Sequence, residues 1–217
     1  MSRWIRSGMC SIATAAAAMS TLTASNRVSA AIDLSLQPSQ PAYFVGQIVP
    51  IGLYATSDSD QTQLLAALQA VLIWESSELL LTGVSGAGAS PLLISTFGPD
   101  PSGLNESNPP IDGDGLYQAG ALLGQPIGAT PGGTLITTFL FTALTPTAGT
   151  LIELPTTWQG PGGLASTIVF DGTVPGLDVT GTLSGAMVTI LPIPGAPAIA
   201  ILVGLACGRP RRRRSAN

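Results

Sequence analysis

The chain contains no histidine and no lysine, and only 9% of its 217 residues are charged. Its basic residues are all arginines, and every one lies within the first thirty or the last nine residues. The only two cysteines, Cys10 and Cys207, also lie near the ends. These absences exclude a disulfide framework, a zinc site built on Cys or His, and catalysis by Ser–His–Asp or Cys–His groups from the central region.

The central region is strongly acidic. Residues 31–208 hold all 12 Asp and Glu residues and no basic residue, so their formal net charge is −12. A surface of that sign repels phosphate backbones, and nucleic acid is therefore excluded as a partner. The chain is also 45% hydrophobic, with 26 Gly and 18 Pro. That combination is typical of a turn-rich folded domain, because disordered chains pair low hydrophobicity with high charge.

Residues 1–30 have the layout of a secretory signal peptide. Arg3 and Arg6 supply the positive start, an apolar Ala-rich stretch follows, and Val28-Ser29-Ala30 places small residues at the cleavage positions. The alternative is an N-terminal helix of the domain, but the Ala-rich stretch lacks the large apolar side chains that pack a helix onto a core. We therefore expect export with cleavage after Ala30.

Residues 191–217 read as a C-terminal sorting or anchoring segment. A Pro-rich motif is followed by a short apolar helix and then by an Arg cluster at 209–214. The uncharged stretch 195–208 would span about 21 Å as a helix, less than the roughly 30 Å hydrocarbon core of a bilayer. Arginines after such a segment stay on the cytoplasmic side. The alternative is a last core strand with a solvated basic tail.

This tail resembles the PEP-CTERM sorting signal of exported bacterial proteins. The resemblance implies handling by a membrane transpeptidase of the exosortase type and transient membrane anchoring. Pro192-Ile193-Pro194-Gly195 stands where that class carries Pro-Glu-Pro. A variant sorting enzyme and simple tail anchoring are both compatible with this difference.

The middle of the chain, residues 31–190, predicts one all-β domain. Turn signals such as Gly86-Ala87-Gly88, Pro131-Gly132-Gly133 and Asp171-Gly172 separate short runs rich in Val, Ile, Leu, Thr and Phe. This spacing is typical of a single β-sandwich. The expected strands are Ile32–Leu36, Ile48–Tyr54, Ala67–Trp74, Leu79–Val84, Leu92–Phe97, Leu135–Thr142, Thr150–Leu154, Thr167–Phe170 and Ala186–Leu191.

One segment admits two interpretations. Residues 61–74 place leucines and Val71 at helical spacing, but their second half also fits a buried strand. We favour the strand because Trp74-Glu75-Ser76, with Leu79 after it, resembles the strand–turn–strand of cohesin-type domains. Val49–Leu53 and Gly133–Phe141 match an earlier and a later strand of that pattern. The resemblance implies a jelly-roll β-sandwich; cohesins bind dockerin modules, and related sandwiches bind carbohydrate.

Asp112-Gly113-Asp114-Gly115 is the acidic motif with a candidate chemistry. Carboxylates in a flexible loop suit Ca²⁺, and oxygens close upstream belong to Asn105, Glu106 and Asn108. An EF-hand alignment fails, because it puts leucines where further acidic ligands are needed. The motif therefore predicts either a calcium site on Asp112 and Asp114 or an ordinary Asp-Gly turn. We expect no other cofactor.

Carbohydrate binding and glycoside hydrolysis are two further activities that the sequence supports only weakly. A sugar platform needs exposed coplanar aromatic rings, and Trp158, just before Gly160-Pro161-Gly162-Gly163, is the best candidate for one; the alternative is a ring that plugs a loop. A glycosidase needs a specific pair of carboxylates, and no pair stands out among the twelve.

Together these features predict an exported, non-enzymatic protein of the bacterial cell surface, outer membrane or extracellular matrix. Its C-terminal helix would contact the membrane, and its partners would be a sorting transpeptidase and a polysaccharide or surface protein. The alternative is a cohesin-like module that binds carbohydrate or protein, and a carboxylate-dependent glycosidase is the distant alternative.

Overall fold

The computed structural model describes residues 31–98, 103–160, 163–173 and 176–195. These residues form β-strands and a single 3-10 turn, η1 (Leu122–Gly124), with no α-helix among them. The predicted signal peptide, apolar helix and Arg cluster lie outside the described residues. Within the described ranges no helix is long and apolar enough to cross a membrane.

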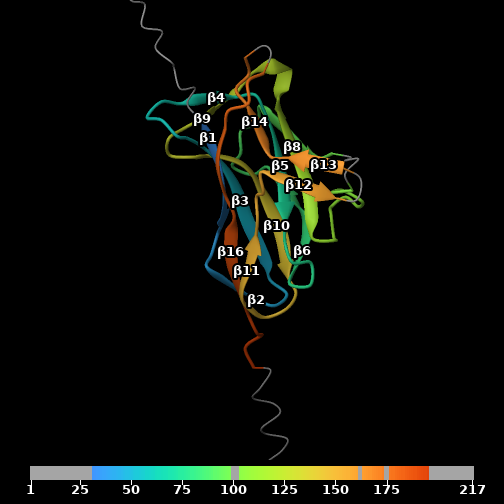
Figure 1. Ribbon diagram of the computed structural model, residues 1–217. Helices are drawn as coiled ribbons and strands as arrows, with labels where there is room; N and C mark the ends of the chain where they lie inside the picture. The colour runs from blue at the N-terminus through green and yellow to red at the C-terminus, as the bar shows by residue number, and fades with distance from the viewer. Residues whose placement is uncertain (1–30, 99–102, 161–162, 174–175, 196–217) are drawn as a thin grey trace, which may run out of the picture.

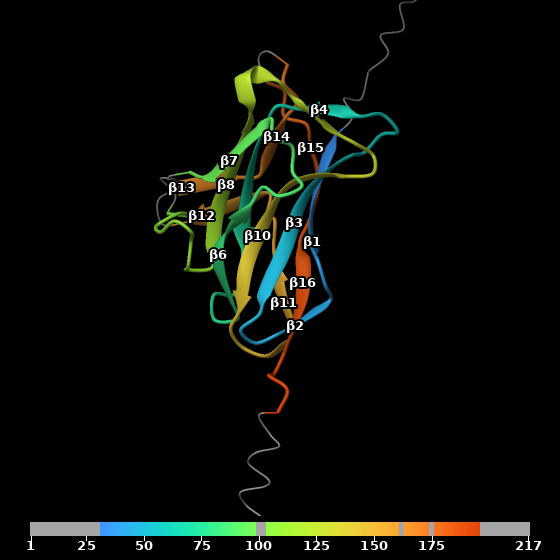
Figure 2. The same cartoon turned by 180° about the vertical axis from the view of Figure 1, so that it is seen from behind.

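One layer is a five-stranded sheet, which faces the viewer in Figure 2. Its order is β15 (Thr180–Ser184), β1 (Ile32–Pro38), β3 (Ile48–Ser57), β10 (Thr134–Ala143) and β6 (Leu79–Ser85). The β1–β15 pair is parallel and the other pairs are antiparallel. Alternate residues of β1 and β3 are buried, which is the period of a strand with one face on a core.

The opposite layer consists of two smaller sheets, one above the other in Figure 1. The four-stranded sheet has the order β14 (Ile168–Phe170), β5 (Ala67–Ile73), β8 (Asp114–Ala121) and β7 (Leu93–Phe97). The three-stranded sheet has the order β11 (Thr147–Ile152), β16 (Ala186–Leu191) and β2 (Ala42–Phe44). Two two-stranded sheets complete the domain: β4 (Gln63–Leu65) pairs with the distant β9 (Ile127–Ala129), and β12 (Thr157–Gly160) pairs with β13 (Gly163–Ser166) as a hairpin.

Aromatic rings join the two layers. Tyr117 of the four-stranded sheet meets Phe139 of the five-stranded sheet edge to face, with ring centroids 5.2 Å apart. Phe97 contacts both rings, at 5.9 Å from Tyr117 and 6.0 Å from Phe139. Edge-to-face pairs of this kind add stability beyond the area they bury. Burial raises the pKa of the Tyr117 phenol, since the interior disfavours its charged form.

The strand–turn–strand prediction at Trp74 is confirmed. β5 leads into Trp74, residues 75–78 turn, and Leu79 begins β6. The indole of Trp74 is buried, donates a hydrogen bond to the Leu79 carbonyl at 3.1 Å, and packs on Phe141 with centroids 5.3 Å apart. The ring therefore fixes both ends of the turn.

All nine expected strands are present, and the strand interpretation of Ala67–Trp74 is confirmed by β5. The helical alternative for residues 61–74 is wrong, because they form β4 and β5. The pairing of β5 with both β14 and β8 outweighs the helical spacing of its leucines. The sequence did not predict seven of the strands, which are β2, β4, β8, β9, β12, β13 and β15. Among them β8 is central to its sheet, and Gly115 and Gly120 disfavour a strand there in isolation. Tertiary pairing supplies what local propensity lacks.

The buried aromatic contacts give the first prediction. Phe139→Ala should lower the free energy of unfolding by about 3–5 kcal/mol, because a fully buried ring leaves a cavity between the layers. Urea denaturation measures the change. Leu164→Ala, on the exposed side of the β12–β13 hairpin, should leave stability almost unchanged. Equal losses in the two variants would contradict this account of the core.

Candidate functional site

The outer face of the four-stranded sheet carries side chains in rows, because paired residues on neighbouring strands lie side by side. The registers align Phe170, Ala67, Gly120 and Ile94 in one row across all four strands. In that row the two smallest residues occupy the two central strands, and a large apolar residue stands on each side. Strands about 4.8 Å apart make such a row about 14 Å long. The row is therefore hollowed in the middle.

The next rows explain where the hollow ends. Gln69 and Gln118 are paired on β5 and β8, and their side chains are hydrogen bonded at 3.2 Å. Gln69 also donates to the Ser166 carbonyl of the β12–β13 hairpin at 2.8 Å. Beyond the glutamines, Val71 and Leu116 face outward but are buried.

A second small core covers that further half of the sheet. Val71 and Leu116 pack with Leu104 from the loop before β8 and with Ala165 from β13. Asn105 fixes the loop: its side-chain oxygen accepts from the Leu116 amide at 3.0 Å, and its amide donates to the Leu116 and Gly98 carbonyls. One half of the outer face is thus sealed and the other half is open.

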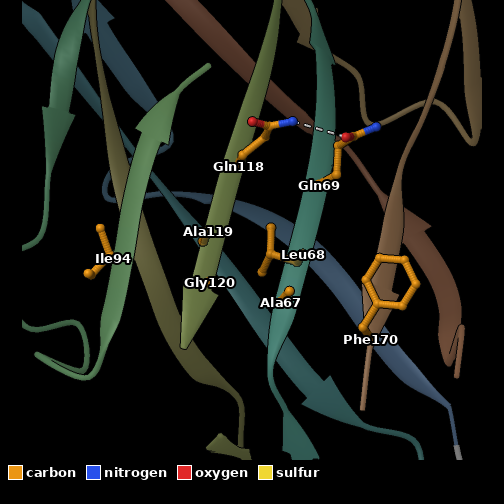
Figure 3. A pocket seen from close by; sticks show the side chains of 8 residues that line it. All are labelled: Ala67, Leu68, Gln69, Ile94, Gln118, Ala119, Gly120 and Phe170. Carbon is orange, nitrogen blue, oxygen red and sulfur yellow. Dashed lines mark hydrogen bonds between the residues drawn. The ribbon is translucent and has the colours of Figure 1, made fainter. Parts of the chain in front are cut away.

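Figure 3 shows the open half, which we call the docking face: Ala67, Gln69, Ile94, Gln118, Gly120 and Phe170. It encloses a shallow hollow of about 330 Å³. The glutamine pair closes one end, and Ile94 and Phe170 stand at its sides. Ile94 is 59% exposed, although isoleucine usually lies inside. No residue that lines the hollow is charged, so the hollow suits an apolar surface rather than an ion.

The loop after Phe170 is held by one carboxylate. Asp171 Oδ1 accepts hydrogen bonds from the amide and hydroxyl of Thr173, both at 2.8 Å, and from the Leu177 amide at 3.3 Å. These bonds, first among them the one from the Thr173 amide, hold the pKa of Asp171 below its ordinary value of 3.8. Gly176 lies against the Phe170 ring, and Phe170 lines one side of the hollow. The conformation of this loop therefore affects the position of that ring.

The predicted calcium residues lie away from the docking face. Asp112 is exposed in the turn before β8, and Asp114 is the first residue of that strand, paired with Ile73. Between them Gly113 has φ +102°, and its carbonyl accepts from the Trp74 amide at 2.7 Å. A Cβ on Gly113 would lie 2.7 Å from the Trp74 carbonyl oxygen, so the turn requires glycine there.

Asn105 does not join Asp112 and Asp114 as a candidate calcium ligand, because its side chain is hydrogen bonded to the backbone of Leu116 and Gly98. Glu106 and Asn108 line a separate hollow with Phe97. Among the described residues no group of three or more Asp, Glu, His or Cys is placed to hold a metal ion. Calcium binding through Asp112 and Asp114 stays a prediction.

Trp158 is a packed residue and not part of an exposed platform. It is half-buried on β12 and packs against the small core of Val71, Leu104, Leu116 and Ala165. The alternative of a plugging ring is therefore the one that the structure supports. Phe170 is the single aromatic residue that lines the docking face.

The sequence did not single out the docking face. Its central strand, β8, was not predicted, and its key positions are alanine, glycine and glutamine, which carry no chemical signature of their own. The available signal was the alternation of Leu116, Gln118 and Gly120 with Tyr117 and Ala119, which is the period of a strand with two different faces.

Comparison with known proteins connects this architecture to one fold. The cohesin module of a family 33 glycoside hydrolase from Clostridium perfringens aligns with a TM-score of 0.56 and 12% identity, over 76% of this chain and 99% of that one. CaCohA2 of Clostridium acetobutylicum, in its complex with CaDoc0917, aligns at 0.52 and 11% over 74% and 99%.

The seventh ScaB type I cohesin of Pseudobacteroides cellulosolvens aligns at 0.50 and 10% over 76% and 95%. No protein-family model and no curated protein matches the chain. The chain therefore has a cohesin-like β-sandwich, as the Trp74 pattern predicted. At such low identity the likeness concerns the fold.

The Asp171 contacts predict a local response to acid. Because the folded state lowers this pKa, the carboxylate contributes stability above its ordinary value of 3.8, and the contribution is lost as the pH falls through the lowered value. Exchange protection of the Thr173 and Leu177 amides should then decrease before the sheets unfold. Asp171→Asn keeps an acceptor that does not titrate, so in this variant protection should not change over the same range. Equal pH dependence in both proteins would contradict the assignment.

The calcium prediction has a direct thermal test. A cation that binds only the folded state stabilises it by about 2.7 kcal/mol at a hundredfold excess over its Kd. Calorimetry of the chain in Ca²⁺ and in chelator should show a higher Tm with Ca²⁺, and Asp114→Ala should abolish the difference. No shift, or the same shift in the variant, would leave the Asp-Gly turn as the role of the motif.

Proposed function

We propose that the chain is an exported, non-enzymatic binding module that docks a protein partner on the open half of its four-stranded sheet. The observation that carries the proposal is the docking face itself. It is an uncharged hollow with an exposed isoleucine, on a sheet whose other half is sealed by a dedicated loop and hairpin.

The fold supports the same proposal by analogy. CaCohA2, whose sandwich aligns with this chain, is found in a complex with CaDoc0917. That complex shows that a sandwich of this shape can present a protein-binding surface. Fold alone does not transfer a partner, so the proposal depends on the residues of the docking face.

The competing functions receive less support from these residues. A sugar platform needs several coplanar rings, and Phe170 is the single ring at the docking face. A glycosidase needs two carboxylates across its substrate, and none lines the hollow. A protein partner needs apolar surface beside a hollow that can exclude water. Ile94 at one side and the Ala67–Gly120 pair in the middle provide these.

Export and sorting complete the proposed function. The signal-like residues 1–30 would direct the chain outward, and residues 191–217 would hold it at the membrane or pass it to a transpeptidase of the exosortase type. β1 begins at one end of the sandwich and β16 ends at the other (Figure 1). A tail that leaves from the end of β16 would keep the docking face, on the upper half of the sandwich in Figure 1, at a distance from the membrane.

Filling the hollow tests the proposal. A Cβ added at Gly120 would have no other atom within 4 Å, so Gly120→Arg should fold normally. The long arginine side chain should then fill the hollow and block it. Ile94→Asp should remove the apolar anchor. The immobilised full-length chain is exposed to the secreted and surface proteins of its native cells, and retained proteins are measured by mass spectrometry. We expect at least one protein to be retained by the wild type and reduced about tenfold or more by either variant, a loss of about 1.4 kcal/mol.

Leu151→Asp is the matched control. Leu151 is a half-exposed leucine on β11, in the other sheet of the same layer, and it should retain what the wild type retains. A glycan array is read in parallel. If all variants retain the same proteins, the docking face is not the binding site. If Gly120→Arg instead loses a glycan, the carbohydrate alternative replaces the proposal.

A further inference from the structure

The turn that follows β8 has an exposed leucine at its centre, in an unfavourable conformation. Leu123 is 89% exposed, and its backbone has φ 53° and ψ 28°. Among the described residues it is the one non-glycine residue with positive φ. The left-handed region is unfavourable for leucine, because its Cβ crowds the following carbonyl oxygen. Neither local conformation nor core packing accounts for a leucine here.

The turn is fixed in place beside the docking face. The Ala121 amide donates to the Ala66 carbonyl, and the Leu122 amide donates to the Leu92 carbonyl, both at 2.7 Å. These bonds tie the turn to the segments that lead into β5 and β7. Leu92 and Leu122 are themselves exposed, so apolar side chains continue from Ile94 to the turn. We call Leu122 and Leu123 the leucine tip.

A pair of carboxylates lies by the opposite strand of the docking face. Asp171 directly follows Phe170, and Asp178 forms a β-bridge with Phe170. The loop that carries Asp171 reaches back toward the tip, because a Cβ on Gly172 would lie 3.1 Å from Cγ of Pro126. Residues 31–195 contain no Lys, Arg or His, so no side chain of the domain can neutralise these carboxylates.

We propose that Leu123 anchors the docked partner by inserting into an apolar groove of it, while Asp171 and Asp178 pair with a Lys or Arg of the same partner segment. The inference rests on the proposed function and specifies the chemistry of its partner. That partner presents an apolar strip that ends in a basic residue. The backbone of Leu123 is held in place before binding by the bonds that fix the turn, so little backbone freedom is lost when the complex forms.

Charge decides between this occupant and the others. A partner with a basic end is attracted by a domain of formal charge −12 that has no cation of its own. The folded domain of a second copy would bring the same charge of −12 against the first. An anionic lipid surface would be repelled in the same way. A basic protein segment is therefore the occupant that the electrostatics favour.

The test uses a phage-displayed library of random peptides, selected on the immobilised full-length chain. Leu123→Asn is the main variant, since asparagine is of similar size and tolerates the left-handed region. We expect the selected peptides to combine large apolar residues with Lys or Arg. Leu123→Asn should weaken their binding about tenfold to a hundredfold, because burial of one leucine side chain in the complex is lost. Asp178→Asn should weaken it at low salt, and the difference should shrink at high salt.

Two control variants separate binding from folding. Leu151→Asn makes the same substitution at an exposed leucine on β11, away from the docking face. This variant should bind the peptides as the wild type does. Leu123→Gly relieves the unfavourable backbone, so its Tm should equal or exceed that of the wild type while binding is still lost. If Leu123→Gly or Leu123→Asn binds as the wild type does, the leucine anchor is refuted.

The remaining outcomes distinguish a failure of the Leu123 anchor from a failure of the proposed docking face. Peptides that lose binding in Gly120→Arg but not in Leu123→Asn would refute the anchor and leave the docking face in place. Failure to select any peptide that depends on Gly120 would count against both. A wild-type dimer in sedimentation that Leu123→Asn dissociates would assign the tip to a second copy and overturn the basic partner.

Discussion

The contact of Tyr117 with Phe139 holds the two layers of this sandwich together. The domain has no cysteine, so no disulfide can join the sheets, and it has no cationic side chain, so no ion pair between its own side chains can do so. Packing of apolar surface must therefore supply the stability. The rings of Phe97, Tyr117 and Phe139 concentrate that packing where β7, β8 and β10 face one another.

The same packing determines what the outer face can do. Tyr117 and Ala119 point into the core, and the alternation along β8 then turns Leu116, Gln118 and Gly120 outward. Of these, Leu116 is covered by the small second core, while the other two remain at the open half. The docking face is thus a consequence of how the core fixes β8 and of how far the covering loop and hairpin extend.

Electrostatics and shape act at different distances in the proposed binding. The −12 charge of the central region acts before contact, by attracting basic partners and repelling acidic ones. The hollow between Ile94 and Phe170 is uncharged and acts only at contact, by excluding water from apolar surface. Leu123 extends that surface beyond the sheet. In the proposed function, the net charge would supply selectivity and the apolar anchor would supply residence time.

The sequence by itself determined the fold class, nine of the sixteen described strands and the turn at Trp74, because alternation and turn residues act locally. It also set the net charge and excluded thiol and histidine chemistry. Tertiary structure alone decided the rest. Gly120, Ala67 and Phe170 form one row only through the register of three strands, and residues 61–74 became strands through pairing with β8, β9 and β14. Contacts between distant segments leave no periodic trace in a single sequence, so the docking face became visible only in the folded chain.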